Sequence, residues 1–353
     1  MKKIRFTASR NYDLLIGRDL LKQVGQLTAG YLPPSRLLII TDDRVGALYA
    51  EIVRRSFEEA GFTVCSYQFP SGEGEKNTRR LIDILEYAAR EQFTRSDVFV
   101  ALGGGVAGDM AGLAAALFLR GVSYIQIPTT FLAAIDSSVG GKTAVNLSTG
   151  KNLMGAFWQP SLVLCDVDAF ATLEQKVFSD GAAEAVKYGV IYDEALFASL
   201  ENGLCAKAVP EDIIARCVEL KRDVVREDEY DKGQRQLLNF GHTAGHAIER
   251  LSNYRITHGH AVATGMRIMT RAAERNGLCR EPFSARLERA LSQNGLSGLC
   301  DFSASELADA ALSDKKRMGE NVTIVIPERL GKCVLHTMPV SELQAFFEAG
   351  LSV

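Results

Sequence analysis

Short β-rich runs alternate with helical segments through the first half of this 353-residue chain, and this alternation limits the folds open to it. The apolar, β-branched runs lie at residues 36–42, 62–69, 97–102, 124–127 and 161–166. A repeated strand-then-helix pattern is typical of a largely parallel sheet with helices on both faces. The sequence therefore predicts an α/β fold for this half.

The second half has a different rhythm, which becomes helical from about residue 178. Amphipathic stretches lie near 182–205, 211–226, 241–252, 259–276 and 283–294, and residues 321–327 form the one obvious strand. A chain of this length suits two domains. We expect an α/β domain over residues 1–174, a mainly α-helical domain over residues 175–353, and a packed junction with a cleft between them.

Composition excludes several classes of partner. Hydrophobic residues make up 47% of the chain, and the formal net charge of -3 gives no general attraction to nucleic acid or to an anionic membrane. The basic amino terminus is not followed by an apolar core, and the apolar run 110–135 is interrupted by Arg120 and Pro128. The seven cysteines show no Cys-x-x-Cys spacing. We expect reduced thiols in a cytoplasmic protein that binds neither membrane nor nucleic acid.

Four of the five histidines lie within residues 242–260, and such crowding suggests a metal site. A catalytic zinc ion takes three His or Glu ligands and keeps one open position, and Glu184, His242 and His258 could supply that set. His246 follows His242 at i, i+4 and so shares its helical face. The residue after His242 is a threonine, where a zinc protease carries its glutamate base, so the protease class is excluded.

A glycine-rich segment, Gly103-Gly104-Gly105-Val106-Ala107-Gly108-Asp109, separates a predicted strand from a predicted helix. Backbone amides at such a helix start can face an anionic pyrophosphate. No acidic residue follows at the spacing of the usual dinucleotide fingerprint, but Asp42 ends the first long strand and could bind a ribose. A purely structural turn is the alternative. The polar segments 71–76 and 128–130 at other strand ends favour cofactor binding.

A set of cationic segments suggests an anionic ligand. The first two are Asp136-Ser-Ser-Val-Gly-Gly-Lys142 and Gly150-Lys151-Asn152, and Lys187, Lys221, Arg235, Lys315 and Lys316 follow. Each lysine alone would be read as a solvated surface group. A nucleotide P-loop is excluded, because its first glycine would have to stand where Asp136 stands. The set suits a small substrate that carries phosphate and carboxylate groups.

The order and spacing of these motifs resemble the 3-dehydroquinate synthases from about Asp42 to the carboxyl terminus. The likeness is carried by the glycine-rich segment, Phe118-Leu-Arg-Gly-Val, Ile127-Pro-Thr-Thr, the two lysine segments, Glu184-Ala-Val-Lys-Tyr-Gly, Leu237-Leu-Asn-Phe-Gly-His-Thr-Ala-Gly-His-Ala-Ile-Glu and Asp314-Lys-Lys. The resemblance implies a Rossmann-like amino-terminal domain and a mainly α-helical carboxyl-terminal domain.

The resemblance also implies a carbon–oxygen lyase of the shikimate pathway, which leads to chorismate and the aromatic amino acids. Such an enzyme converts 3-deoxy-D-arabino-heptulosonate 7-phosphate into 3-dehydroquinate and phosphate. The steps are transient oxidation, phosphate elimination, reduction and an intramolecular aldol. The implied cofactors are NAD, which is regenerated in each turnover, and Zn²⁺, with Co²⁺ as an alternative.

Carried over position by position, the resemblance implies a role for each candidate residue. The zinc ligands would be Glu184, His242 and His258. The substrate phosphate would be surrounded by Lys142, Asn152, Asn239, His246 and one of Lys315 and Lys316. Lys221 and Arg235 would lie near the substrate carboxylate, and Lys187, Asp136 and Asp231 would hold hydroxyls. NAD would contact Asp42, Glu73, Lys76, Gly104, Gly105, Val106, Gly108, Asp109, Thr129, Thr130, Lys142, Lys151 and Thr172. Arg120 would reach the site of a neighbouring subunit in a homodimer.

Two departures from the family pattern and three rival functions remain. His260 stands where most members have glutamate and could be a partner of a ligand, a competing ligand or a neutral variant, and Asp231 also replaces a common glutamate. The rivals are another sugar phosphate cyclase, a metal-dependent NAD alcohol dehydrogenase of the glycerol dehydrogenase type, and a non-catalytic NAD-binding regulator. The dehydrogenase would lack the phosphate and carboxylate cations and would release NADH.

Overall fold

The chain forms two compact units. The computed structural model describes residues 1–296, 298, 300–314 and 320–352. The first unit comprises Met1–Leu173 and Val209–Tyr230, and the second comprises Glu174–Ala208 and Asp231–Val353. The first boundary between the units, after Leu173, lies beside the boundary predicted at residue 174.

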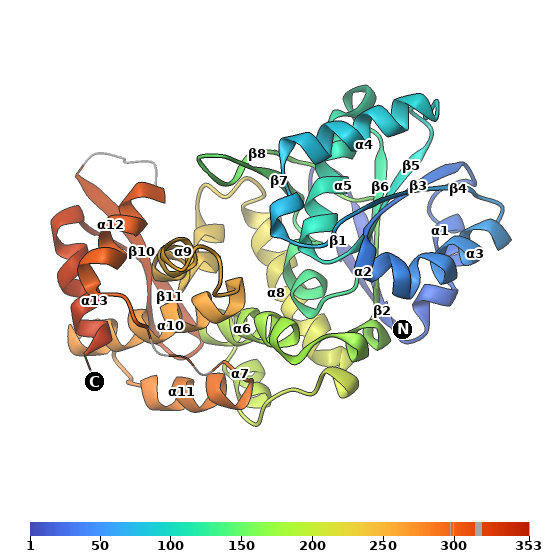
Figure 1. The fold of residues 1–353 in the computed structure, drawn as a ribbon. Helices are drawn as coiled ribbons and strands as arrows, with labels where there is room; N and C mark the ends of the chain where they lie inside the picture. Colours follow the sequence, from blue (N-terminus) through green and yellow to red (C-terminus); the bar gives the residue numbers. More distant parts are fainter. Residues whose placement is uncertain (297, 299, 315–319, 353) are drawn as a thin grey trace. The chain divides into compact units, whose positions relative to one another are not determined.

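A seven-stranded sheet organises the first unit (Figure 1). Its strands, in spatial order, are β1 (Lys2–Phe6), β2 (Tyr12–Gly17), β9 (Leu162–Asp166), β6 (Ser123–Pro128), β5 (Val98–Gly103), β3 (Arg36–Asp42) and β4 (Thr63–Phe69). All neighbours pair in parallel except β1 with β2. This confirms the predicted, largely parallel α/β architecture.

Helices cover both faces of this sheet. The core on one face includes side chains of α4 (Thr78–Arg90) and α5 (Gly105–Leu117), and the core on the other includes side chains of α1 (Val24–Ala29) and α3 (Glu51–Glu59) (Figure 1). The central strands β3 and β5 are buried along nearly their whole length because both faces are covered. A short helix, α2 (Asp43–Val45), follows β3 directly.

Helix α8 (Glu211–Glu227) also belongs to the first unit, although the prediction placed its residues in the second domain. It packs against β1, β2 and the short η5 (Ala133–Ser137). Its buried face includes Ile214 and Val218, and Lys2 forms an ion pair with Asp212 at its start. Amphipathic periodicity predicted the helix correctly, but it does not show which sheet the apolar face covers.

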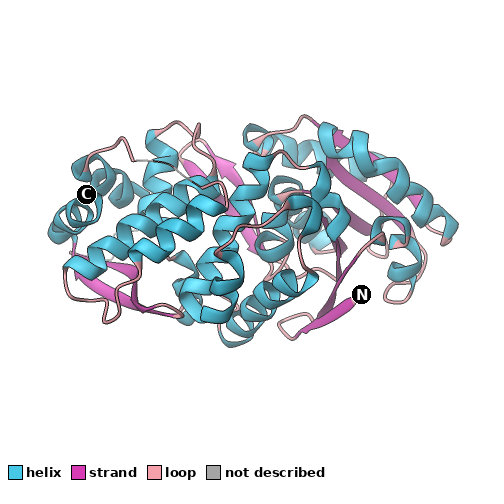
Figure 2. Ribbon diagram, turned by 90° about the horizontal axis from the view of Figure 1, so that it is seen from below, coloured by secondary structure: helices cyan, strands magenta, loops and turns pink. Residues whose placement is uncertain are grey.

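The second unit is mainly helical (Figure 2). Its helices are α6 (Gln175–Tyr192), α7 (Glu194–Leu200), α9 (His242–Leu251), α10 (His258–Arg275), α11 (Ser284–Gln293), α12 (Ala304–Asp314) and α13 (Leu343–Leu351). Helix α10 is the core element, since it packs against α6, α9, α13 and a β-hairpin. The hairpin joins β10 (Asn321–Arg329) to β11 (Lys332–Pro339). No helix among the described residues is long and apolar enough to cross a membrane.

One helix boundary and five strands differ from the sequence prediction. The stretch predicted as one helix over residues 182–205 is divided at Asp193, whose carboxylate accepts a hydrogen bond from Leu196 N and so caps α7. Strand β11 was not predicted, because its exposed side lacks the apolar run that marked β10. The β1–β2 pair and the hairpin of β7 (Lys142–Leu147) and β8 (Gly150–Phe157) were also missed. Most of β8 is exposed, so its sequence has little strand pattern.

Close contact between α9 and α10 depends on a glycine. A Cβ added to Gly265 of α10 would lie 2.0 Å from the carbonyl oxygen of Gly241, which immediately precedes α9. Two atoms that are not bonded to each other cannot lie this close, so a side chain at Gly265 must push the helices apart.

We therefore expect Gly265→Ala to lower the free energy of unfolding by about 1–3 kcal/mol. Urea unfolding measures this effect. Gly74→Ala is the control, because nothing lies within 4 Å of the Cβ position at Gly74. Equal stability of the two variants would contradict the packing argument.

Candidate active site

Glu184 lies on α6 with no exposed surface. A buried carboxylate needs compensating charge or hydrogen bonds. Lys187, one helical turn further on, forms an ion pair with Glu184 Oε2 and is itself 2% exposed. The other oxygen, Oε1, faces two imidazoles. The side chain is therefore held in one orientation by a cation on one oxygen.

His242 is the first residue of α9 and presents Nε2 to this carboxylate at 3.7 Å from Glu184 Oε1. Its Nδ1 is 3.2 Å from the carbonyl oxygen of Phe240, which accepts a hydrogen bond when that nitrogen carries the proton. Burial, followed by the charge of Lys187, lowers the pKa of His242 well below 6.5, against an opposing effect of Glu184. The ring is thus neutral near pH 7, as a metal ligand has to be.

His258 opens α10 and lies between two carboxylates. Its Nε2 is 3.2 Å from Glu184 Oε1, and its Nδ1 is 3.2 Å from Glu249 Oε2. Burial by itself would lower the pKa of His258. The hydrogen bonds to Glu184 and Glu249 outweigh burial and raise that pKa to about 10.

The three predicted metal ligands come together in the second unit. One ligand atom from each of Glu184, His242 and His258 lies within 4.8 Å of the other two. Ligands about 2.0–2.1 Å from a tetrahedral zinc ion are about 3.3 Å apart, so the observed separations from Glu184 Oε1 need only small adjustments. Two imidazoles and one carboxylate are also a known ligand set of catalytic zinc. The residues therefore fit a metal ion.

The described residues contain a second such group, His246, Glu249 and His258. His246 is exposed, and its ring centroid is 5.2 Å from that of His242 and 6.1 Å from that of His258. Both groups need His258, so one ion cannot be held by all their members in the arrangement observed. Sequence reasoning missed Glu249, although its position three residues after His246 on the same helical face was a usable indication.

His260 contacts Asp180 and belongs to neither group. Asp180 Oδ1 accepts hydrogen bonds from the Thr257 hydroxyl (2.7 Å) and the His260 backbone N–H (3.1 Å), and it lies 3.0 Å from His260 Nδ1. Of the roles considered for His260, that of a competing ligand has no support from these contacts.

In the first unit, the glycine-rich segment forms the start of α5, with Gly104 as its N-cap residue. A Cβ on Gly108 would lie 2.9 Å from Gln126 Oε1 of β6, and one on Gly104 would lie 3.0 Å from Thr130 Cγ2. These glycines let the helix approach the neighbouring strand closely, which is the role of the third glycine in dinucleotide-binding turns. The first-turn amides remain directed out of the helix start.

A buried ion pair lies beside this helix. Lys76 Nζ is 2.5 Å from Asp109 Oδ2 on α5 and donates to Asn152 Oδ1 on β8 at 2.5 Å. Burial raises the pKa of Asp109, against an opposing effect of Lys76. Glu73 accepts a hydrogen bond from Asn146 in the same region. The structure thus joins residues predicted for NAD, Lys76 and Asp109, to one predicted for phosphate.

Lys221 of α8 and Asp136 of η5 also meet in the first unit. The ammonium of Lys221 forms an ion pair with the Asp136 carboxylate and donates to the Asp136 carbonyl oxygen at 2.6 Å. The two residues are 85 positions apart in the sequence, so only the fold brings them together. Asp42 uses Oδ1 to accept from Arg44 N and Val45 N at the start of α2.

The other predicted positions lie as follows. Thr129 is buried after β6, Val106 and Gly105 lie in the first turn of α5, and Thr172 exchanges a hydrogen bond with Tyr49. Arg120 and Lys142 are exposed and Lys151 is half-buried. In the second unit Arg235 is 2% exposed, Asn239 is exposed and Asp231 is half-buried. Lys315 and Lys316 lie outside the described residues.

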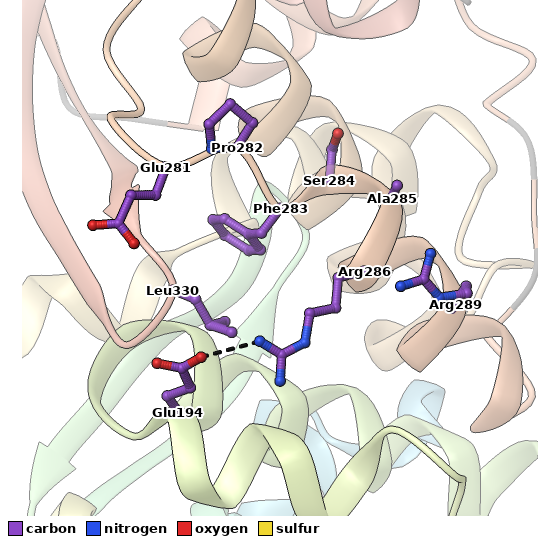
Figure 3. A pocket seen from close by; sticks show the side chains of 9 residues that line it. All are labelled: Glu194, Glu281, Pro282, Phe283, Ser284, Ala285, Arg286, Arg289 and Leu330. Carbon is purple, nitrogen blue, oxygen red and sulfur yellow. Dashed lines mark hydrogen bonds and ion pairs between the residues drawn. The ribbon is translucent and has the colours of Figure 1, made fainter.

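A separate pocket of the second unit does not involve the described candidate residues. It is lined by Glu194, Glu281, Pro282, Phe283, Ser284, Ala285, Arg286, Arg289 and Leu330 (Figure 3). Arg286 donates to Glu194 at 3.0 Å and to Glu201 at 2.7 Å, so its charge is already compensated. We place no part of the candidate site there.

Solved structures with a similar fold define the class. A 2-deoxy-scyllo-inosose synthase complexed with carbaglucose-6-phosphate, NAD⁺ and Co²⁺ is 26% identical with a TM-score of 0.88, and the match covers 99% of this chain and 100% of that one. A glycerol dehydrogenase from Schizosaccharomyces pombe is 14% identical with a TM-score of 0.61 over 98% and 91% of the two chains, and shares the fold alone. The fold is that of the sugar phosphate cyclases.

Sequence comparison gives the family. Models described as the amino-terminal and carboxyl-terminal parts of 3-dehydroquinate synthase match residues 66–180 and 181–317. A 3-dehydroquinate synthase of Streptococcus suis (strain 05ZYH33) is 41% identical over 96% of this chain and 97% of its own length. One of Enterococcus faecalis (strain ATCC 47077 / OG1RF) is 40% identical over 96% of each. The chain belongs to the 3-dehydroquinate synthase family.

Metal binding at His258 should depend on pH. Since the pKa of this ring is about 10 in the metal-free fold, zinc has to displace one proton, and its apparent affinity should rise about tenfold per pH unit between pH 7 and 9. The proton itself stabilises the metal-free fold below pH 6.5, and that stabilisation is lost as the pH rises through about 10. Chelator competition at several pH values measures the slope. A slope near zero would show that His258 is already neutral.

Proposed function

We propose that this chain is a 3-dehydroquinate synthase, which converts 3-deoxy-D-arabino-heptulosonate 7-phosphate into 3-dehydroquinate and phosphate. The observation that carries the proposal is the likeness to curated enzymes of this name along 96% of the chain, together with the Glu184, His242 and His258 group. The reaction needs a redox cofactor, a metal and a set of cations in one protein. The described residues offer groups suited to each.

The proposed metal is Zn²⁺, or Co²⁺, held by Glu184, His242 and His258. When bound, it supplies Lewis-acid chemistry, polarising the substrate hydroxyl that is oxidised. The ion pair of Lys187 with Glu184 Oε2 keeps Oε1 directed at the imidazoles. We also assign Lys187 to a substrate hydroxyl. The ammonium would then link the ligand carboxylate to the substrate.

The proposed redox cofactor is NAD, which would accept the hydride and return it within each turnover. Its pyrophosphate suits the amides at the start of α5, where the glycines leave no side chain in the way. The related synthase that contains NAD⁺ supports this assignment at 26% identity. The residues assigned to NAD are Asp42, Glu73, Lys76, Gly104, Gly105, Val106, Gly108, Asp109, Thr129, Thr130, Lys142, Lys151 and Thr172.

The remaining residues are assigned to the substrate. Lys142, Asn152, Asn239, His246 and one of Lys315 and Lys316 would bind the phosphate, and cations there favour its departure as an anion. Lys221 and Arg235 would bind the carboxylate, while Asp136 and Asp231 would bind hydroxyls. Lys221 is paired with Asp136 in the structure. A carboxylate and a hydroxyl of one substrate could therefore contact both members of this pair.

We further propose a homodimer that works in the cytoplasm. No disulfide joins the described cysteines, and four of them are buried, which suits a reducing compartment. Arg120 is exposed and its backbone has φ 69°, a conformation that costs energy in a non-glycine residue. Contact with a neighbouring subunit would give that exposed, constrained position a role.

The decisive assay supplies heptulosonate phosphate, NAD in catalytic amount and zinc. We expect stoichiometric release of phosphate, a product with the mass of dehydroquinate, and no accumulation of NADH, because the hydride returns in each cycle. Phosphate, NADH absorbance and product mass are followed together. Steady NADH formation without phosphate would instead indicate an alcohol dehydrogenase, and no reaction at all would favour a non-catalytic NAD-binding protein.

Loss of a ligand should separate metal chemistry from folding. We expect Glu184→Ala to lose zinc binding and at least about 99% of the activity while the protein stays folded, because three protein ligands are needed for catalytic zinc. Metal content, turnover and circular dichroism are compared with those of Glu274→Ala, a variant of α10 outside the proposed site. Full activity without bound metal would contradict the proposed function.

A further inference from the structure

His258 lies between two carboxylates that contact opposite edges of its ring. Glu184 Oε1 is 3.2 Å from Nε2, and Glu249 Oε2 is 3.2 Å from Nδ1. Each ring nitrogen has a single lone pair directed away from the ring, so one metal ion can take only one of them. His242 also directs Nε2 at Glu184 Oε1. The metal position is therefore on the Nε2 edge, and Nδ1 is left to Glu249.

We propose that Glu249 is a positioning residue for the metal site: it accepts the Nδ1–H of His258 and holds Nε2 toward the ion. Glu249 is 3% exposed, so its carboxylate gains little from water and needs a donor. A carboxylate on the second nitrogen of a ligand imidazole fixes the ring's tautomer and orientation and makes the ligand more basic. The inference rests on the metal ligands assigned in the proposed function.

Helix geometry explains why Glu249 can act in this way. It follows His242 by seven residues on α9, which is close to two helical turns, so the two side chains leave the helix on the same face. His258 comes from α10, and the two helices approach closely at Gly265 and Gly245, where a Cβ would lie 2.0 Å from Gly241 O and 3.1 Å from Val262 Cα. One helix thus provides both a ligand and the group that orients the next ligand.

The backbone of His258 is fixed separately. Asp180 lies one turn before Glu184 on α6. It accepts hydrogen bonds from the Thr257 hydroxyl and from the His260 backbone N–H, so it holds the chain on both sides of His258. A Cβ on Gly259 would lie 2.3 Å from Asp180 Cα, so this contact is as close as a backbone permits. With the backbone held, only the side-chain torsions of His258 remain free. The contact with Glu249 restrains those torsions.

Zinc affinity and a cobalt spectrum test the role of Glu249. We compare Glu249→Ala, Glu249→Gln and Glu274→Ala in the full chain at pH 7.5. The readouts are the zinc Kd from chelator competition, the visible spectrum of the Co²⁺ form and the urea unfolding midpoint. Glu274 is the matched control, because it too accepts several hydrogen bonds, from Phe283 N, Ser284 N and the Ser284 hydroxyl, at the other end of α10.

We expect Glu249→Ala to weaken zinc binding about 10–100-fold while the Co²⁺ band positions stay those of the parent protein, because the ligands themselves are unchanged. Glu249→Gln should recover part of this affinity, since its amide oxygen can accept the same Nδ1–H. Glu274→Ala should lower the unfolding midpoint and leave the zinc Kd within about twofold of the parent value.

Two results would overturn the inference. An unchanged zinc Kd in Glu249→Ala would show that the residue serves folding alone, and shifted Co²⁺ bands would show that Glu249 is itself a ligand, with His246 and His258. Glu184→Ala separates these results from failure of the metal assignment. If zinc affinity depends on Glu184 but not on Glu249, the positioning role is wrong and the metal site stands; if it depends on neither, the metal assignment fails and this inference fails with it.

Discussion

The buried carboxylate of Glu184 is the group around which the side chains of the proposed metal site are arranged. Removing an ionised carboxylate from water is costly unless opposite charge and hydrogen-bond donors surround it. Lys187 pairs with one of its oxygens, and His242 and His258 face the other. These partners come from α6, α9 and α10. The three helices therefore have to pack so that the partners surround this one carboxylate. A divalent cation between the two imidazoles and Glu184 Oε1 would satisfy the same constraint.

Close backbone approach makes this convergence possible. At Gly265 and Gly259 of α10 the helix meets its neighbours at distances that exclude any side chain. In the first unit the missing side chain of Gly108 likewise lets α5 pack closely against β6. Glycine is costly inside a helix because it gives up more conformational freedom than other residues on folding. In this protein the contacts made at these positions offset that cost, since ligands on neighbouring helices must lie within a few ångströms of each other.

The parallel sheet and most helices could be predicted from the sequence, because alternating apolar runs report local structure directly. The five predicted strands of the first half are all present. Strands β1, β2, β7, β8 and β11 were missed, and β8 is exposed along most of its length. The metal group was predicted from crowded histidines and from family resemblance. Glu249 was missed although it shares a helical face with His246, and its contact with His258 appears only once α10 is packed against α9.

By itself the sequence determined the residue types, the helices that carry them and the family to which the chain belongs. It placed His242 and His246 on one helical face, since that follows from a period of 3.6 residues. Only the tertiary structure decided that α8 joins the first unit, that Lys221 pairs with Asp136, and that His258 has a carboxylate at each nitrogen. Most of these contacts join residues far apart in the chain, and no local periodicity encodes which distant residues meet. They are set by which apolar faces bury each other, and that depends on all the elements of a unit at once.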